Sequence, residues 1–151
     1  MSGIVEIMAD AAMNRAAVPM LSYEDVGAAA DWLCDAFGFS EVGERFTDDR
    51  GRVNHAEIER EGALVYLGWP GQGYRSPAHH AELCDYAREW SAVPFIVNGV
   101  HITVDDVDAH CEHAREAGAT ILREPSTEPY GRLYNAADLE GHRWMFMSEL
   151  R

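Results

Sequence analysis

The sequence is poor in basic residues and has no long hydrophobic run. Its 151 residues include 12 basic against 26 acidic ones, which gives a formal net charge of −14 at pH 7. Such a charge repels phosphate backbones, so we expect no nucleic-acid partner. No stretch approaches the roughly 20 apolar residues of a membrane helix, and the first residues lack the basic start, apolar core and cleavage site of a secretory signal. These absences predict a cytoplasmic protein with no membrane partner.

Other signals of familiar chemistry are also missing. An odd number of cysteines without any Cys-x-x-Cys spacing argues against a disulfide framework. The glycines at positions 68, 71 and 73 do not lead from a strand into a helix as nucleotide-binding loops do, and no Ser-His-Asp order is present. Histidines and cysteines near positions 80 and 110 have helical spacing but lack the further ligands of a zinc site. We therefore expect no cofactor.

What the sequence does contain is an internal repeat. A Tyr-Glu-Asp-Val motif before an apolar helical pattern is echoed by Val-Asp-Asp-Val before another. Asp25 and Asp106, the third residues of these motifs, lie 81 positions apart, and the turn glycines Gly62 and Gly141 lie 79 apart. Two markers at nearly one offset indicate a duplicated unit.

Each copy has the pattern of a β-α-β-β-β unit. Asp25 is typical of a residue that begins a helix, and Gly38 of one that ends it. Period-two alternation predicts the strands, and it places His55 and Glu57 on one face of theirs. The expected first copy is strand 18–23, helix 26–37 and strands 41–46, 53–60 and 63–68; the second is strand 99–104, helix 107–117 and strands 120–123, 132–137 and 143–147.

The whole chain, 1–151, is predicted to be one domain. The first unit spans 17–68, a linker spans 69–98 and the second unit spans 99–148. Residues 1–16 show no clear period and are interpreted as a frayed leader or a first helical turn. The linker is expected to hold one helix, begun near Pro77, whose apolar stripe comprises His80, Leu83, Cys84, Ala87 and Trp90.

This doubled order resembles the vicinal oxygen chelate superfamily, which includes glyoxalase I, the extradiol dioxygenases and the bleomycin-resistance proteins. The resemblance rests on Val104–Asp108 and on the Asp-x-x-Gly-x-x-Trp motif of Asp138–Trp144, and it covers Val18–Ser148. Glu128–Gly131 and Gly141–Phe146 are similar to the PhnB-like and bleomycin-resistance-like branch. The implied fold class is α+β, with the two units forming a half-open, U-shaped mixed sheet around a cavity and the helices outside.

In metal-using members of the superfamily, the resemblance implies four side-chain ligands, one on the first and one on the last strand of each unit. The corresponding positions here are Val18, Tyr66, Gly99 and Met145. None of them supplies the imidazole or carboxylate that a hard or borderline cation needs. A shift of two residues would put Met20 and His101 in place of Val18 and Gly99 at the ligand positions of the first strands, which adds one ligand at best. The sequence therefore predicts no metal at the family's site.

The resemblance also places several rings and one thioether around the cavity: Tyr66, Trp69, Tyr130, Tyr134, Trp144 and Met145. Such side chains suit a planar or apolar ligand, although Tyr66 and Trp144 have a second interpretation as sheet core. His101 is the single candidate catalytic residue; it is a general base, a ligand donor or a polar lining. Arg75 either clamps an anionic ligand group or ties down its own loop.

The leading prediction is a metal-free protein that binds and sequesters a small drug or toxic metabolite of apolar or aromatic character. One rival is a lyase, isomerase or dioxygenase of the same superfamily, with a relocated metal or with His101 as a metal-free base. A second rival is a regulatory or interaction module with a vestigial cavity. Similarity to bleomycin-resistance proteins implies a homodimer whose ligand crevice is shared between subunits.

Overall fold

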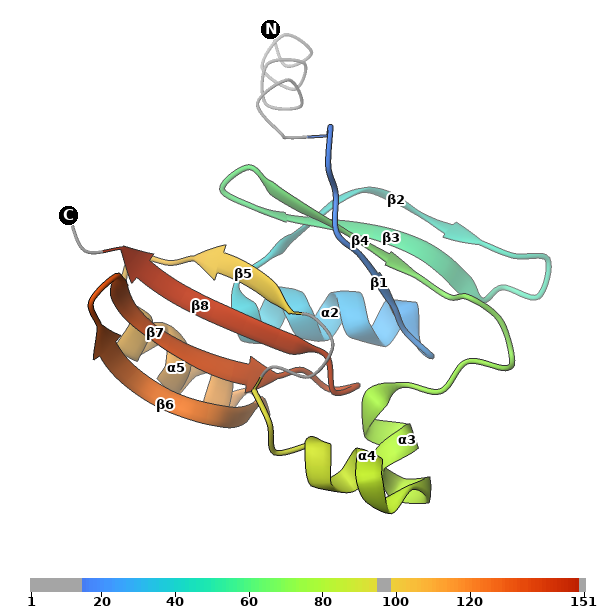
Figure 1. Cartoon of the computed structure of the whole chain (residues 1–151). Helices are drawn as coiled ribbons and strands as arrows, with labels where there is room; N and C mark the ends of the chain where they lie inside the picture. The colour runs from blue at the N-terminus through green and yellow to red at the C-terminus, as the bar shows by residue number, and fades with distance from the viewer. Residues whose placement is uncertain (1–14, 95–98, 150–151) are drawn as a thin grey trace, which may run out of the picture.

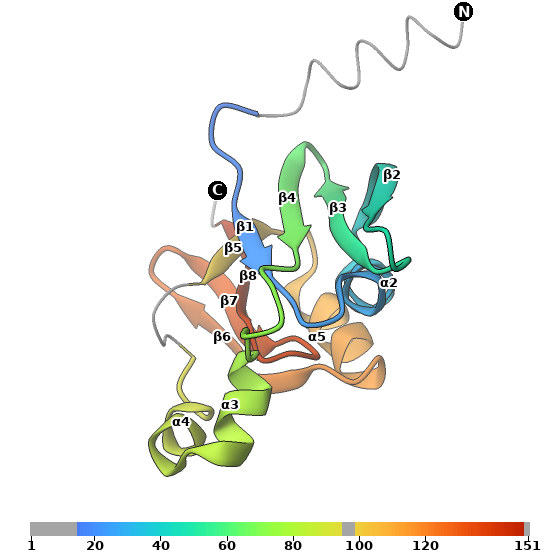
Figure 2. The same cartoon turned by 90° about the vertical axis from the view of Figure 1, so that its right-hand side faces the viewer.

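The computed structural model describes residues 15–94 and 99–149, and it confirms the α+β class and the tandem β-α-β-β-β units (Figure 1). The strands form two four-stranded sheets with the same order, β1-β4-β3-β2 and β5-β8-β7-β6. In each sheet the first strand of the unit pairs in parallel with the last, and the other pairs are antiparallel. Over the described residues the sheets stay half-open and do not close into a barrel (Figure 2).

The first unit follows the predicted order closely. Its elements are β1 (Met20–Ser22), α2 (Val26–Phe37), β2 (Ser40–Thr47), β3 (Val53–Arg60) and β4 (Ala63–Gly68). Helix α2 begins where expected because the Asp25 carboxylate accepts a hydrogen bond from the Ala28 amide at 3.0 Å. It ends at Gly38, whose φ of 79° is a left-handed conformation that favours glycine.

The second unit repeats this order of elements. Its elements are β5 (Val100–Thr103), α5 (Val107–Glu116), β6 (Thr120–Glu128), β7 (Gly131–Ala137) and β8 (Arg143–Glu149). Strand β6 continues past its predicted end at Arg123, although Pro125 has no amide to donate. The pairing with β7 shifts register between Arg123 and Ser126, and such an irregularity lets a strand accommodate a proline and resume its ladder.

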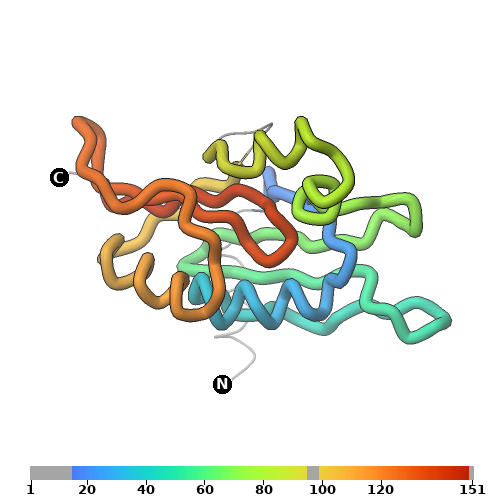
Figure 3. The backbone as a smooth tube through the Cα atoms, turned by 90° about the horizontal axis from the view of Figure 1, so that it is seen from below, coloured from blue at the N-terminus to red at the C-terminus, as the bar shows by residue number. Residues whose placement is uncertain are grey.

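One hydrophobic core joins the two units. Phe37 at the end of α2 packs edge-on against Phe146 of β8, with ring centroids 4.7 Å apart, and tilted against Trp144 at 5.5 Å. Helices α2 and α5 contact each other (Figure 3), and the Trp32 indole donates a hydrogen bond to the Ala117 carbonyl at 3.1 Å. The sheet faces that carry this core are therefore closed to any ligand.

His110 of α5 strengthens the same junction. Its Nε2 lies 2.9 Å from the Phe37 carbonyl oxygen and its Nδ1 lies 2.7 Å from the Tyr134 hydroxyl. A carbonyl only accepts, so Nε2 carries the proton and Nδ1 accepts from the hydroxyl. Burial lowers the pKa of His110, which favours this neutral ring. His110 thus links the two units.

The linker differs from its prediction. It forms two short helices, α3 (Pro77–Leu83) and α4 (Asp85–Trp90), because Cys84 between them is extended, with φ −141° and ψ 123°. The prediction of a single helix is wrong, and its apolar stripe is not buried: neither helix has a buried residue, and Leu83 and Trp90 are 71% and 57% exposed. We call residues 76–93 the helical insert. The predicted linker also includes residues 95–98, which lie outside the described residues, as does most of the predicted leader.

Cys34, Cys84 and Cys111 are all free thiols. Burial raises the pKa of Cys34 and of Cys111, so both stay protonated thiols near neutral pH.

Among residues 15–94 and 99–149, no helix combines the length and the apolar character that crossing a membrane requires.

Candidate functional site

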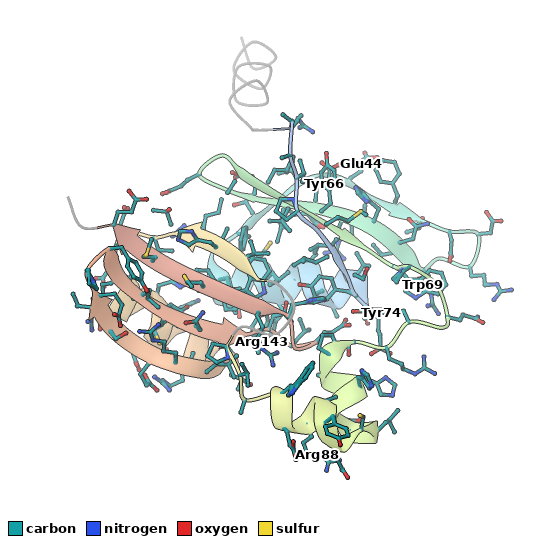
Figure 4. The ribbon with its side chains drawn as sticks, viewed as in Figure 1. Glu44, Tyr66, Trp69, Tyr74, Arg88 and Arg143 are labelled. Carbon is teal, nitrogen blue, oxygen red and sulfur yellow. The ribbon has the colours of Figure 1, made fainter. Side chains whose placement is uncertain are left out.

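Each sheet has one face in the core and one open face. On the first sheet, Ile58 and Leu67 are fully buried against the core, while Glu57 and Tyr66 are only partly buried. Glu57 and Tyr66 are cross-strand partners, so period two puts both on the face opposite the core. Figure 4 shows Tyr66 on the side of this sheet that faces away from α2.

An aromatic cluster lies on this open face. The His55 ring is 5.3 Å from the Tyr66 ring at an interplanar angle of 63°, and 5.7 Å from the Phe46 ring. Its Nε2 is 3.3 Å from a carboxylate oxygen of Glu57. Phe46 is 61% exposed and Met20 of neighbouring β1 is 71% exposed. Exposed rings and a thioether beside a polar pair are the composition of a ligand-binding face.

Alternation along β3 places His55 and Glu57 on one face, but it does not single them out as site residues. The missing step was the pairing of β3 with β4, which sets Tyr66 directly opposite Glu57. Phe46 was missed as well, because a register shift between Val42 and Phe46 changes which residues of β2 reach His55.

The strand register shows which residues lie opposite Tyr66 and Met145, two of the positions at which the resemblance implies metal ligands. Met20 pairs with Tyr66 and His101 pairs with Met145, which is the shifted alternative of the sequence analysis; Val18 and Gly99 precede their strands. Two thioethers, a phenol and one imidazole do not make a site for a hard or borderline cation. Within residues 15–94 and 99–149, no three His, Cys, Asp or Glu side chains are grouped to hold a metal ion.

The open face of the second sheet is of a different kind. His101 is exposed and Met145 beside it is partly buried. Asn135, the partner of Met145 on β7, is only 2% exposed, and its Oδ1 accepts no hydrogen bond from the described residues. This face therefore carries a thioether, one imidazole and an amide in place of the three clustered rings of the first sheet.

Two predicted ligand-contacting residues lie on the wrong face. Tyr134 and Trp144 are both fully buried in the core. The Tyr134 hydroxyl bonds to His110, and the Trp144 indole donates to Asp138 at 3.0 Å. Trp144 directly precedes Met145, so the two side chains point to opposite faces of β8. The interpretation of Trp144 as sheet core is confirmed, and the expectation that Tyr134 lines the open side is wrong.

The three predicted loop residues lie in three separate places. Trp69 stacks under the Arg52 guanidinium, 4.0 Å from the ring centroid, beside a hollow of about 280 Å³, and Figure 4 shows it well apart from Tyr66. The Nη1 of Arg75 donates to the Gln72 and Tyr74 carbonyls and so ties down its loop. Tyr130 is 59% exposed at the β6–β7 turn.

A cluster of carboxylates at the unit boundary has a structural role. Glu140 accepts the backbone amides of Glu24 and Asp25 at 2.7 and 3.0 Å, and burial raises its pKa. The Glu24 carboxylate accepts the Ser76 amide at 3.1 Å and lies 3.0 Å from Nδ1 of His79. The hydrogen bond with His79, aided by those with Ser76, lowers the pKa of Glu24 to about 2. These groups join α2, the insert and the β7–β8 turn.

Comparisons with known proteins agree with this architecture. The model of the Glyoxalase/Bleomycin resistance protein/Dioxygenase superfamily matches residues 13–146. TioX from Micromonospora sp. ML1 has a similar structure, with a TM-score of 0.65 and 30% identity over 88% of this chain and 97% of that one. TnmS3, described as an antibiotic binding protein from Streptomyces sp. CB03234, shares the fold at a TM-score of 0.59 and 19% identity over 91% and 99% of the two chains.

A further relative is an uncharacterised protein of Mycobacterium tuberculosis, Rv0887c. It is 28% identical over 138 residues, which are 88% of this chain and 74% of that protein. The family model spans most of the chain, and the doubled β-α-β-β-β unit is the one that the resemblance implied. The chain belongs to the glyoxalase/bleomycin resistance protein/dioxygenase superfamily.

Proposed function

We propose that this protein binds and sequesters a flat aromatic drug or toxic metabolite without chemical conversion and without a metal. The observation that carries the proposal is the aromatic cluster of Phe46, His55 and Tyr66 on the open face of the first sheet, with ring separations of 5.3 and 5.7 Å. Rings at this spacing offer walls against which a planar ligand can stack. Glu57 beside them would orient a ligand by accepting a hydrogen bond.

Two further observations support binding over metal chemistry. Tyr66 and Met145 lie at implied ligand positions, and together with their cross-strand partners Met20 and His101 they suit dispersion contacts better than metal coordination. TnmS3, which shares the fold, is described as an antibiotic binding protein. We also propose that the protein belongs to the PhnB-like branch of the superfamily and that it is cytoplasmic, as the sequence predicts.

We also propose that two copies assemble so that the open faces cooperate. Each chain has two such faces, one aromatic and one carrying His101 and Met145, and both leave large side chains partly exposed. A homodimer that sets the first sheet of one copy against the second sheet of the other would enclose a ligand on both sides. Such enclosure is what small-molecule sites need to bury most of a ligand's surface.

A metal-free lyase or isomerase is the second candidate. The specific observation in its favour is the 3.3 Å contact between His55 Nε2 and Glu57, because a carboxylate-paired imidazole is a general base. His101, exposed on the second sheet, is a further imidazole that could act as a base. Catalysis predicts that a bound ligand is converted, whereas sequestration predicts that it is recovered intact.

The test is ligand binding by variants of the open face. Bleomycin and doxorubicin serve as aromatic probes in a thermal-shift screen followed by calorimetry. We expect binding by the wild type, a loss of about tenfold in Tyr66→Ala and in Phe46→Ala, and no change in Tyr130→Ala, which removes an equally exposed ring elsewhere. Equal affinities in all four proteins would overturn the assignment of the face.

The two candidates separate in the same experiment. Mass spectrometry of the ligand after prolonged incubation should return the unmodified compound if the protein only sequesters it. Conversion that His55→Asn abolishes, with binding retained, would establish the enzyme instead. Size-exclusion chromatography with light scattering tests the dimer, which should weaken or disappear in Met20→Glu.

A further inference from the structure

The helical insert is tied to the second unit at both of its ends by polar contacts. At its start, the Ala78 amide donates to the Glu140 carbonyl at 2.9 Å, and a side chain added at Gly141 would come within 2.8 Å of the Ala78 nitrogen. At its end, the Arg143 guanidinium donates to the carbonyls of Val93 and Ser91 at 3.0 and 2.9 Å. Because both ends of the insert contact the second unit, the insert has a defined position against the β7–β8 turn.

Between these ends the insert does not pack. Neither α3 nor α4 has a buried residue, and Tyr86 and Trp90 remain 77% and 57% exposed. The space between the insert and the second unit is a hollow of about 780 Å³, within the range of small-molecule sites. Figure 1 shows the insert standing off from the sheets that it connects.

The lining of this hollow is apolar and aromatic along most of its length. Tyr86, Ala87 and Trp90 contribute from α4, Ala81 from α3, and Leu139, 37% exposed, from the β7–β8 turn. Large side chains that remain exposed around a fixed hollow are what a bound apolar molecule covers. None of these five residues belongs to the open faces described above.

Two of the three formally charged side chains in the lining are arginines. Arg75 and Arg143 both border the hollow. The described residues supply only backbone carbonyls as hydrogen-bond acceptors for these two guanidinium groups. Arg143 is only 7% exposed, so it is a nearly buried cation without a hydrogen-bonded carboxylate. In a chain with a net charge of −14, this is a local excess of positive charge.

The single acidic residue in the lining does not cancel this excess at the ligand's position. Asp138 is 6% exposed. Its two oxygens accept four hydrogen bonds, from the Tyr23 hydroxyl, the Trp144 indole and the backbone amides of Glu140 and His142. These donors turn the carboxylate toward the core and away from a ligand.

The geometry points to a second ligand site in this hollow, for a small aromatic acid. The apolar wall around Trp90 would take the ring system, and the ligand's carboxylate would approach Arg75, with Arg143 behind it. A charge-assisted hydrogen bond from Arg75 would give the site its preference for an anion. This site is separate from the open faces, so it stands whether or not those faces bind a drug.

The experiment uses 2-naphthoate as the probe and the neutral amide of the same ring, 2-naphthamide, as its matched control. Binding to the full chain is measured by calorimetry and located by amide chemical-shift changes. We expect shifts in residues 75–91 and 137–143, affinity for naphthoate about tenfold lower in Trp90→Ala, and affinity about threefold lower in Arg75→Gln. Arg75→Gln should leave naphthamide binding unchanged.

Two controls keep the outcome clear. Trp90 and Arg75 are exposed, so both variants should unfold at the wild-type denaturant midpoint. Tyr66→Ala, which damages the open face, should bind naphthoate as the wild type does; a loss there would assign the probe to the open face and overturn the second site. The proposal also fails if naphthoate does not bind at millimolar concentration, or if the charged and neutral probes lose affinity equally in Arg75→Gln.

Discussion

Helix α2 and the helical insert are attached to the rest of the molecule in opposite ways. Helix α2 is amphipathic, and its buried stripe ends in Phe37 between two rings of the second unit. The insert has no buried residue in its helices and is fixed by hydrogen bonds at its ends, through Ala78 and Arg143. Apolar burial couples α2 to the whole fold, whereas end contacts position the insert and leave its apolar residues free.

This contrast separates stability from binding. Burial of an aromatic side chain contributes several kcal/mol to folding, while each of the partly buried hydrogen bonds at the ends of the insert contributes about 0.5–3 kcal/mol. A segment held by such contacts can be altered without unfolding the protein. The same segment lines the hollow of about 780 Å³. Sequence changes in the insert would therefore alter ligand preference with little effect on the stability of the core.

The largest effect is expected when the anchor of α2 is removed. Phe37→Ala should lower the free energy of unfolding by about 3–5 kcal/mol, because it leaves a cavity between Trp144 and Phe146. Trp90→Ala removes a larger side chain from the insert but should change stability by less than about 0.5 kcal/mol. Urea denaturation of both variants measures the difference, and similar losses would show that the insert is part of the folding core.

A smaller effect is expected at the residue that serves both regions. The Glu140 side chain accepts the Glu24 and Asp25 amides at the start of α2, while its backbone carbonyl holds Ala78 of the insert. Glu140→Ala should therefore destabilise the protein by about 1–3 kcal/mol through the two unpaired amides, with the insert still attached.

Hydrogen exchange distinguishes the two attachments in Glu140→Ala. Amides of α2 should lose protection, and those of α3 should not. Glu112→Ala on α5 is the matched control, because its carboxylate forms only an exposed pair with Arg115 at 3.4 Å, and it should change stability by less than about 0.5 kcal/mol. Equal loss of protection in α2 and α3 would mean that the side chain, not the carbonyl, holds the insert.

The sequence alone predicts the bounds of α2 but not the structure of the insert, and the difference has a physical reason. Local signals determine both ends of α2: a carboxylate that accepts an amide at Asp25 and a left-handed glycine at position 38. The insert also has helical periodicity, but periodicity predicts a buried stripe only if a partner surface exists. Cys84 breaks the helix in an extended conformation that no local pattern announces.

The candidate site shows a similar limit. Alternation along a strand already places the side chains of Trp144 and Met145 on opposite faces. The sequence alone is therefore enough to exclude that both line the same cavity. The aromatic cluster was not predictable in the same way, because it depends on the partners across β2, β3 and β4 and on a register shift before Phe46. Cross-strand pairing is a tertiary property, and a single sequence specifies it only weakly.

The smallest expected effect is a pH-dependent loosening of the insert. The Glu24 carboxylate holds the Ser76 amide and His79, and its pKa is lowered from 4.5 to about 2. A carboxyl group with a lowered pKa stabilises the structure above its unfolded value and loses that contribution as protons bind. The contacts of Glu24 should therefore be complete above about pH 4.5 and weaken progressively as the pH falls toward about 2.

Because the insert has no apolar burial to compensate, we expect this loss to appear there first. Hydrogen exchange, corrected for the intrinsic rate, should show falling protection of residues 76–83 between about pH 4.5 and the onset of global unfolding, with residues 29–37 of α2 still protected. In Glu24→Gln, which has no charge to lose, protection of the insert should be low and independent of pH over that range. A wild-type insert that stays as protected as α2 until the whole protein unfolds would show that the two regions form one cooperative unit, and the contrast between them would then fail.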